Sequence, residues 1–468
     1  FESLSLRHSS KTFIGRTMAI QNLHWKPNLS QQPETIIGKD NTLRTYFIWT
    51  IGCQMNTADS NRLGSALQQM GLSEAASMKT ADVVVLNSCV VRQSAEDKVT
   101  GTLGLLKPVK ASNPNSVIAL MGCMVGPKTE ELAERFKHVD VFMQPQQYEP
   151  LLNLLGDRLG IDPEGCLSTL SDINADVTCY IPIIQGCDYF CSFCIIPYRR
   201  GRQSSRPLQD IVHETELMAA RGVREVTLLG QTVDAYGLDT PSKDDLADLL
   251  YGLQGIQGLE RIRFLTSHPL HMSDRIINAV NELPKVCEHI NLPIQAGDND
   301  VLKAMRRPYT TDDYLRLIDK IRNTIPGVAL STDLIVGFCG ESDTAFQASY
   351  NLLEAVQFDK VHVAQYSTRK GTIADRTLVD DVPKDEKKRR LMAVDALQES
   401  ISTDINSRLL GQTVEVLVEG RDKGKWKGRT RTDKLVFFEN EMNFHGQITD
   451  VRINKTAPWS LQGEPVVG

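Results

Sequence analysis

The sequence has no long hydrophobic run and no strong net charge. None of its apolar stretches approaches the roughly 18 residues that a membrane-spanning helix needs. The net charge is only −6 over 468 residues, so a surface that binds nucleic acid must be local. We therefore expect several globular domains and no membrane span.

The sequence also lacks the cysteine pattern of a small disulfide-stabilised secreted domain. Ten cysteines in so long a chain do not suggest such a framework. Their clustering favours metal ligation in a reducing compartment and predicts a cytoplasmic location. Residues 1–43 are rich in Ser, Thr and basic side chains at their start. We expect them to form a disordered tail, and a remnant of an organelle-targeting segment is the alternative.

Three apolar runs in the predicted first domain, residues 44–152, each end at a cysteine. They are "TYFIWTIGC", "ADVVVLNSC" and "SVIALMGC", and they end at Cys53, Cys89 and Cys123. Continuous apolar runs with helical stretches between them predict a flavodoxin-like parallel sheet, and Thr57 is the candidate N-cap of the first helix. Because parallel strands end at one edge, the three thiols should converge in a shared metal site. Three unrelated buried cysteines are the alternative.

After a predicted linker at residues 153–178, six more apolar runs alternate with helical patterns. They predict a partial (β/α)6 barrel within a second domain at residues 179–410. Catalytic groups of such barrels lie at the carboxyl ends of the strands. Three cysteines, Cys187, Cys191 and Cys194, follow the first strand in "QGCDYFCSFCIIP".

This cysteine loop has no fourth cysteine nearby. A zinc ribbon would need a second C-x2-C pair, and the sequence contains only the pair Cys191 and Cys194. Three thiolates can instead hold three irons of a [4Fe–4S] cluster and leave the fourth iron open to another ligand.

The C-x3-C-x2-C loop resembles that of the radical S-adenosylmethionine (SAM) superfamily. The longer stretch "GCDYFCSFCIIPYRRGRQSSRP" resembles its methylthiotransferase family, and "GCQMN" is similar to a signature of the MiaB-type, tRNA-modifying branch. The blocks "LLGQTVDAYG", "LPIQAG", "MRRPYT", "TDLIVGFCGE" and "YSTRKGT" resemble further family blocks, in the expected order, and the match covers about residues 44–465. The chain departs from the family pattern at Thr232, Asp234, Ala296 and Cys339.

The resemblance implies two [4Fe–4S] clusters and SAM as cofactors. Cys187, Cys191 and Cys194 would hold the cluster that cleaves SAM to a 5′-deoxyadenosyl radical. Cys53, Cys89 and Cys123 would hold a second cluster, which carries or receives the sulfur. The positions expected to contact SAM are Phe193, Gln231, Gln295 and Asp333.

The substrate implied by the resemblance is N6-isopentenyladenosine at position 37 of tRNA, which would receive a methylthio group at C2. The expected partners are the tRNA anticodon stem-loop and an electron donor such as a flavodoxin or ferredoxin, and the enzyme is expected to be a monomer. Three alternatives remain: methylthiolation of threonylcarbamoyl-adenosine in tRNA, methylthiolation of a ribosomal protein, and a non-catalytic, metal-stapled RNA-binding protein.

The chain should end in a long helix that begins near Pro383 and a small β-barrel at residues 411–468. The barrel resembles the TRAM domain, an OB-like RNA-binding module. Its segment 421–434 carries seven basic and two acidic residues, a net charge of +5. Basic side chains neutralise phosphates and an aromatic ring can stack on a base, although a solvated hairpin is the alternative. The predicted RNA contacts are Lys423, Lys425, Trp426, Lys427, Arg429 and Arg431.

Overall fold

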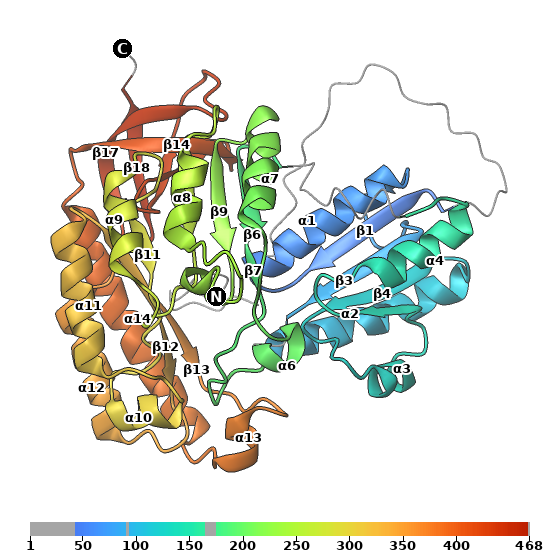
Figure 1. Cartoon of the computed structure of the whole chain (residues 1–468), viewed down its shortest axis with the longest axis horizontal. Coiled ribbons are helices and arrows are strands. Elements are labelled where there is room, and N and C mark those ends of the chain that lie inside the picture. Colours follow the sequence, from blue (N-terminus) through green and yellow to red (C-terminus); the bar gives the residue numbers. More distant parts are fainter. Residues whose placement is uncertain (1–42, 90–92, 164–174, 467–468) are drawn as a thin grey trace.

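The structure, a computed structural model, describes residues 43–89, 93–163 and 175–466. Three folded units follow one another along the chain, coloured blue to teal, green to orange, and red in Figure 1. The predicted N-terminal tail lies outside the described residues, apart from Leu43. Within those residues, no helix has the length and apolar character needed to cross a membrane.

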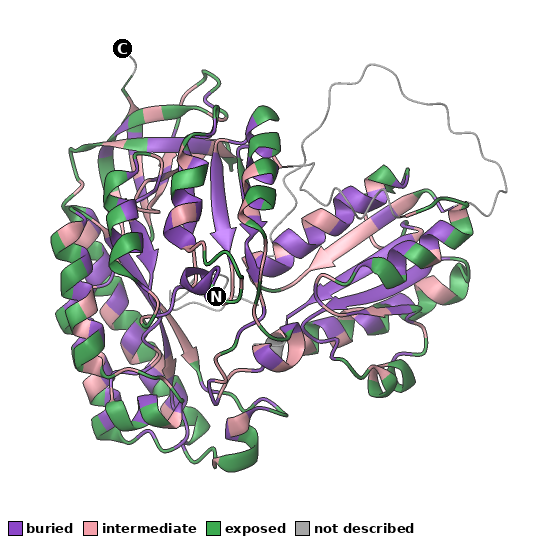
Figure 2. Cartoon of the chain, in the orientation of Figure 1, coloured by how far each residue is buried: buried purple, intermediate pink, exposed green. Residues whose placement is uncertain are grey.

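The first unit is a five-stranded, fully parallel sheet. Its order, β2-β1-β3-β4-β5, is that of flavodoxin-like folds, as predicted. The strands are β1 (Thr45–Thr50), β2 (Ser73–Glu74), β3 (Val83–Ser88), β4 (Val117–Gly122) and β5 (Val141–Met143). Figure 2 shows β3 and β4 buried and β1 only half-buried. The strand order reverses between β1 and β3, which is where ligands bind in such sheets.

Helices cover both faces of this sheet. α1 (Gln54–Gln69) and α4 (Glu149–Leu159) pack on one face, and α2 (Gln93–Ser112) and α3 (Glu130–Arg135) on the other. The N-cap of α1 is Cys53, in an extended conformation, and not the predicted Thr57 one turn later. α4 runs past the predicted boundary at residue 152, since Leu155 belongs to the core of this unit. Residues 164–174 of the predicted linker lie outside the described residues.

The second unit contains the six predicted parallel strands in two groups of three. One sheet has the order β6-β9-β10 and the other β11-β12-β13, with a single bridge from Ile262 of β10 to Val286, just before β11. The strands are β6 (Thr178–Pro182), β9 (Glu225–Leu229), β10 (Arg261–Phe264), β11 (His289–Asn291), β12 (Ala329–Val336) and β13 (Lys360–Gln365). This arrangement is an open barrel.

Helices and short elements complete the barrel. The main helices are α7 (Leu208–Ala220), α8 (Leu246–Gln254), α9 (Asp274–Glu282), α11 (Thr311–Thr324) and α12 (Asp343–Val356). The shorter elements are β7 (Ile184–Gln185), α6 (Ile196–Arg200), β8 (Ser204–Ser205), η2 (Val233–Ala235), α10 (Asn299–Ala304) and α13 (Ile373–Thr377). β7 and β8 form an antiparallel pair around the cysteine loop.

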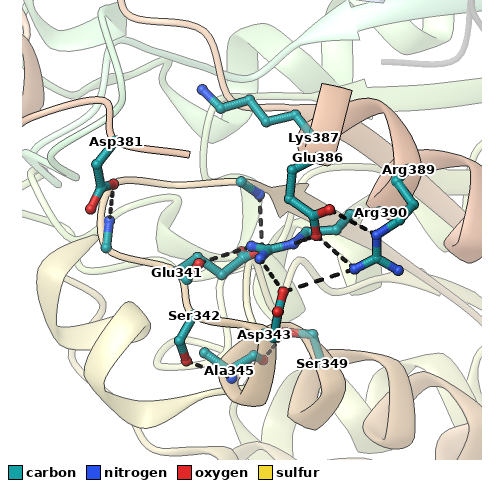
Figure 3. A network of polar contacts seen from close by, with 12 residues as sticks. Glu341, Ser342, Asp343, Ala345, Ser349, Asp381, Glu386, Lys387, Arg389 and Arg390 are labelled. Atoms are coloured by element: carbon teal, nitrogen blue, oxygen red, sulfur yellow. Dashed lines mark hydrogen bonds and ion pairs between the residues drawn. The ribbon is translucent and has the colours of Figure 1, made fainter. Parts of the chain in front are cut away.

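The long helix α14 (Lys384–Ser407) begins after Pro383, as predicted. Arg390 in its second turn is 3% exposed and binds Glu341 Oε1 at 2.7 Å and Asp343 Oδ1 at 2.8 Å (Figure 3). Glu341 also accepts the backbone N–H of Gly337, directly after β12. The buried charges thus fix the loop at the carboxyl end of β12 to the start of α14.

The third unit is the closed five-stranded barrel that the alternating pattern predicted. Its strand order is β14-β15-β16-β18-β17. The strands are β14 (Thr413–Asp422), β15 (Lys425–Thr430), β16 (Leu435–Phe438), β17 (Ile448–Ala457) and β18 (Ser460–Pro465). The basic segment forms the β14–β15 hairpin, with β15 following the turn.

Two buried arginines of β10 attach this barrel to the central one. Arg261 Nη1 donates to Arg429 O at 2.8 Å, and Arg263 donates to Thr430 O and Arg431 O, both at 2.7 Å. Both arginines lie in the first three residues of β10. The C-terminal barrel therefore sits at the amino ends of the central strands, opposite the end that carries the cysteine loop.

Candidate functional site

The first cysteine triad lies in the loop between β7 and α6, and each of two thiols has a polar neighbour from another loop. Cys187 Sγ lies 3.4 Å from Thr232 Oγ1, beyond the end of β9. Arg307 Nη1 donates to Cys191 Sγ at 3.4 Å. The Cys194 backbone N–H donates to Cys191 O at 3.0 Å, which folds the loop back on itself.

These thiols are withdrawn from water. Burial raises the pKa of Cys187, although the hydrogen bond with Thr232 opposes this rise. Burial and the nearby Cys191 both raise the pKa of Cys194. Buried thiols of this kind are poor reagents by themselves, and a bound metal is the strongest means of deprotonating them. Thr232 and Arg307 can each donate to a thiolate sulfur.

The second triad is assembled at the carboxyl edge of the N-terminal sheet. Cys53 caps α1, and its Sγ lies 3.4 Å from Asn56 Oδ1. Cys89 and Cys123 directly follow β3 and β4, and the Cys123 N–H donates to Ser88 O at 2.9 Å. The three cysteines thus occupy the edge on which the sequence placed them, and Cys53 and Cys89 flank the point where the strand order reverses.

A glycine precedes a cysteine in both triads for a steric reason. Gly122 has a φ of +100°, and a Cβ there would lie 2.5 Å from Ser88 O. Gly186 has a φ of +69°, and its Cβ would lie 2.1 Å from Arg202 O. Both backbone contacts are shorter than a side chain allows, so glycine is required for Cys123 and Cys187 to reach their places.

A buried ion pair connects the two triads. Arg200 ends α6, six residues after Cys194, and its Nη2 binds Asp59 Oδ2 of α1 at 2.9 Å. The two side chains are 1% and 0% exposed. The same guanidinium hydrogen-bonds the Cys123 thiol and opposes the rise in the pKa of Cys123 that burial causes.

Apolar contacts bring the two cysteine-bearing ends together as well. Leu229 and Leu265, at the carboxyl ends of β9 and β10, form one cluster with Met55 and Ala58 of α1, against which Cys53 also packs. The N-terminal sheet and the barrel therefore present their carboxyl edges to each other, with one triad on each side.

The donor set fits iron–sulfur clusters better than a single metal ion. In the described ranges, no group of three His, Cys, Asp or Glu side chains is arranged to hold a metal ion, and this includes the two cysteine triads. Each triad supplies only soft thiol donors from one confined edge, and polar side chains stand beside the sulfurs. Three thiolates around a larger, multi-iron group leave one iron open.

The four predicted SAM-contacting residues lie around this barrel mouth. Phe193 is half-buried and meets the Phe338 ring edge-on, with ring centroids 6.4 Å apart. Gln231 lies two residues after β9, and its Oε1 is a buried atom without a hydrogen-bond partner in the described chain. Gln295 has a φ of +75°, and its N–H donates to Asp333 O at 2.9 Å. Their contact with SAM stays a prediction.

Sequence reasoning did not place four polar side chains beside the cysteine sulfurs. They are Asn56, Arg200, Thr232 and Arg307. All four belong to stretches whose similarity to the family had been noted, such as "GCQMN" for Asn56 and "MRRPYT" for Arg307. That similarity was the only available signal, because no local spacing reveals which side chain a folded cysteine meets.

The basic segment of the C-terminal barrel differs from the predicted RNA surface. Trp426 is 5% exposed, and its Nε1 donates to Asn440 O and Met442 O, so this ring is a core residue and cannot stack on a base in this conformation. Arg431 holds Glu288 of the central barrel at 2.6 Å, and Arg429 binds Asp433 at 3.1 Å. Both arginines are committed to contacts within the protein.

Three lysines of the hairpin remain available to a partner. Lys423 is exposed at the turn, Lys425 pairs with Glu439 at 2.9 Å, and Lys427 lies 3.6 Å from Glu419. Surface pairs of this kind are weak and can exchange for phosphate.

Comparisons with known proteins agree with this division of the chain. Residues 45–144 match "Uncharacterized protein family UPF0004", residues 181–353 match the radical SAM superfamily, and residues 407–466 match the TRAM domain. The radical SAM methyltransferase TsrM from Kitasatospora setae, solved with cobalamin and a [4Fe–4S] cluster, superimposes with a TM-score of 0.55 at 13% identity, over 82% of this chain and 81% of that one. At this identity the similarity supports the fold alone.

Curated relatives match nearly the whole chain. A tRNA-2-methylthio-N(6)-dimethylallyladenosine synthase of Roseiflexus sp. (strain RS-1) is 48% identical over 90% of this chain and 89% of its own length. The protein of the same name from Chloroflexus aurantiacus is 46% identical over 90% and 91%. The chain therefore belongs to the radical SAM methylthiotransferase family, in the branch that contains these tRNA-modifying synthases.

Proposed function

We propose that the protein attaches a methylthio group to C2 of N6-isopentenyladenosine at position 37 of tRNA. The observation that carries the proposal is the meeting of two thiol triads at one interface, joined through Arg200. One triad has the spacing of a radical SAM site. The other offers a separate place for sulfur on the facing edge of the N-terminal sheet. The similarity to synthases of this modification supports the choice of base.

The cofactors of this reaction are two [4Fe–4S] clusters and SAM. The carbon at C2 carries no acidic proton, and the first cluster and SAM, when bound, supply the radical chemistry that removes a hydrogen atom from it. The chain's own contribution is to hold the thiols, to bury the site and to fix the distance between the triads. Phe193, Gln231, Gln295 and Asp333 are the proposed SAM contacts.

The buried site limits how substrate can be presented. Position 37 lies in a single-stranded loop, so its base can leave the stack and enter the interface. We assign phosphate contacts of the anticodon stem-loop to Lys423, Lys425 and Lys427. The same proposal includes a flavodoxin or ferredoxin as the electron donor. It also includes a monomeric enzyme and a cytoplasmic location.

Mass spectrometry of tRNA nucleosides tests this function. Cells that lack the gene should lose 2-methylthio-N6-isopentenyladenosine and accumulate N6-isopentenyladenosine. The wild-type gene should restore the modification and Cys187→Ala should not. Unchanged nucleosides would contradict the proposal, whereas loss of a methylthiolated threonylcarbamoyl-adenosine would assign the enzyme to the other tRNA base.

RNA binding tests the role of the hairpin lysines. Each of Lys423→Ala and Lys425→Ala should weaken stem-loop binding, and each should reduce the slope of log affinity against log salt by about one. Asp422→Ala, at an acidic position in the same hairpin, is the matched control and should not reduce that slope. A slope unchanged in both lysine variants would place the RNA elsewhere.

A further inference from the structure

Three buried polar atoms at the ends of β9 and β10 have no hydrogen-bond partner in the described parts of the chain. They are Gln231 Oε1, Ser267 Oγ and His268 Nε2. A buried polar atom without a partner costs about 1–3 kcal/mol, so such atoms are rare unless a ligand satisfies them. Their grouping beyond two neighbouring strands of the barrel marks a place that can receive a polar ligand.

The hydrogen bond at the other ring nitrogen of His268 shows that the unpaired Nε2 is a donor. The Leu270 backbone N–H donates to His268 Nδ1 at 3.2 Å, so Nδ1 carries no proton. Burial, with smaller contributions from nearby Arg307 and His271, lowers the pKa of His268 to about 2, so the ring is neutral at physiological pH. The single ring proton of the neutral imidazole is therefore on Nε2.

The protein holds this ring in a fixed orientation. The Tyr189 ring stacks on it with centroids 4.3 Å apart and planes inclined by 15°. Both carboxylate oxygens of Asp234 accept the His268 backbone N–H, at 2.8 and 2.9 Å. Thr266, two residues before His268, has a φ of +69°, which is strained for a β-branched residue and typical of functional sites. The donor is pre-organised before any ligand arrives.

His268 also lies where the two triads meet. Its stacking partner Tyr189 stands between Cys187 and Cys191 in the first cysteine loop. The turn that carries His268 begins at Leu265, which packs with Met55 and Ala58 beside the second triad. A carbon that gives up hydrogen on one side and accepts sulfur from the other must be held in this region.

We propose that His268 Nε2–H donates a hydrogen bond to a ring nitrogen beside C2 of the target adenine and so orients that carbon. This rests on the proposed function. In adenine, C2 is flanked by N1 and N3, and both are acceptors when N6 carries the substituent. A neutral N–H donor matches either nitrogen. The adenine of SAM offers the same acceptors, so the test must separate the two adenines.

Synthetic anticodon stem-loops test the proposal with the loaded enzyme. They carry N6-isopentenyladenosine or its 1-deaza or 3-deaza analogue at the target position, and RNA affinity is measured anaerobically with SAM but without reductant. Wild-type enzyme should bind one analogue about tenfold more weakly than the parent base. His268→Phe, which keeps a stacking ring but no donor, should bind all three RNAs equally, at about the weaker affinity.

Two further variants separate recognition from folding. His268→Gln restores an N–H donor and should regain part of the discrimination. His271→Phe is the matched control, because the His271 ring neighbours His268 but its Nε2 already pairs with the Tyr189 hydroxyl. It should retain the discrimination of wild type. Iron content and SAM affinity should be unchanged in His268→Phe.

The opposing outcomes are distinct. Equal wild-type affinity for all three RNAs, or full discrimination by His268→Phe, overturns the role of His268. Loss of SAM affinity with normal RNA discrimination overturns it too, and assigns the donor to the adenine of SAM. If wild-type enzyme binds these RNAs but, once reduced, forms no methylthio product on the parent RNA, the proposed function fails instead.

Discussion

The two cysteine triads are held by different kinds of structure. The first occupies eight consecutive residues in one loop, and its order is set by short-range contacts such as the hydrogen bond from Cys194 to Cys191. The second takes one residue from each of three strand ends and exists only when the sheet has formed. The first triad (Cys187, Cys191 and Cys194), here called the loop triad, is therefore a local feature. The second triad (Cys53, Cys89 and Cys123), here called the strand triad, depends on the fold of a whole domain.

The difference extends to the charges beside the sulfurs. In the first triad, Arg307 reaches Cys191 from within the same barrel. In the second, the cation that reaches Cys123 is Arg200, which belongs to the other domain. The strand triad thus needs the barrel domain for its complete surroundings, and the loop triad does not need Arg200 in return.

Single cysteine substitutions should separate the roles of the triads with the largest effect. Cys187→Ala should abolish both SAM cleavage and methylthiolation, because the open iron for SAM is lost. Cys89→Ala should keep SAM cleavage and abolish sulfur insertion. Deoxyadenosine and modified nucleoside are measured in the same reaction, with iron content as control. Loss of SAM cleavage in Cys89→Ala with an intact first cluster would show that the roles are not separate.

Removing Arg200 should damage the strand triad more than the loop triad. Arg200→Met leaves Asp59 charged and buried, which should lower the free energy of unfolding by about 3–5 kcal/mol. Iron loss should concentrate at the second site. The double variant Arg200→Met/Asp59→Leu should recover much of the stability.

A nearby exposed arginine provides the control for this experiment. The Arg202 side chain is 72% exposed and pairs with Asp188, so Arg202→Met should cost at most about 1 kcal/mol. Urea unfolding followed by circular dichroism compares the variants. Equal losses for the two arginines would contradict the dependence on a buried pair.

The stability of the protein should depend on pH through Asp234, which lies near the loop triad. Burial raises the pKa of Asp234 from 3.8 to about 8. Between these values the unfolded chain releases the proton that the folded protein keeps, so stability falls as pH rises towards 8. Asp234→Asn removes this loss, and its melting temperature relative to wild type should increase between pH 5 and pH 8.

Asp59→Asn is the contrasting variant. It leaves Arg200 without its ion-pair partner and should destabilise the protein across the same pH range. Differential scanning fluorimetry at four pH values measures both. A melting difference for Asp234→Asn that does not vary with pH would contradict the shifted titration.

The smallest expected effect concerns a single hydroxyl at the loop triad. Thr232 Oγ1 can donate to a Cys187 thiolate, and hydrogen bonds to ligand sulfurs raise the reduction potential of a bound cluster. Thr232→Val should lower that potential by roughly 20–60 mV, the one-electron equivalent of a typical hydrogen bond. A redox titration followed by electron paramagnetic resonance, in a Cys89→Ala background, isolates the first cluster. An unchanged reduction potential would show that Thr232 contributes packing and no hydrogen bond to the cluster sulfur.

Much of the fold could be predicted because its signals are local. The buried strands are continuous apolar runs, β15 and β16 of the C-terminal barrel alternate with period two, and α14 begins at a proline. The start of α1 was missed because Cys53 acts as an N-cap without a side-chain bond, and cysteine gives no capping signal.

Side-chain roles were predictable only where spacing carries them. The edge shared by Cys53, Cys89 and Cys123 follows from parallel strands. The burial of Trp426 could not be foreseen, because a basic segment with one aromatic ring looks alike whether the ring faces solvent or the barrel core. Arg200 was missed because its partner Asp59 lies 141 residues away.

The attachment of the C-terminal barrel has a consequence for how the two sides of that interface tolerate mutation. Arg261 and Arg263 donate to main-chain carbonyls of residues 429–431, and every amino acid supplies such a carbonyl. Side chains at 429 and 430 can therefore change without loss of these bonds, whereas the two arginines have no substitute with the same reach and donor geometry. Sequence drift should therefore be freer at residues 429 and 430 than at the two arginines, or at Glu415 and Arg431, whose side chains also cross the contact.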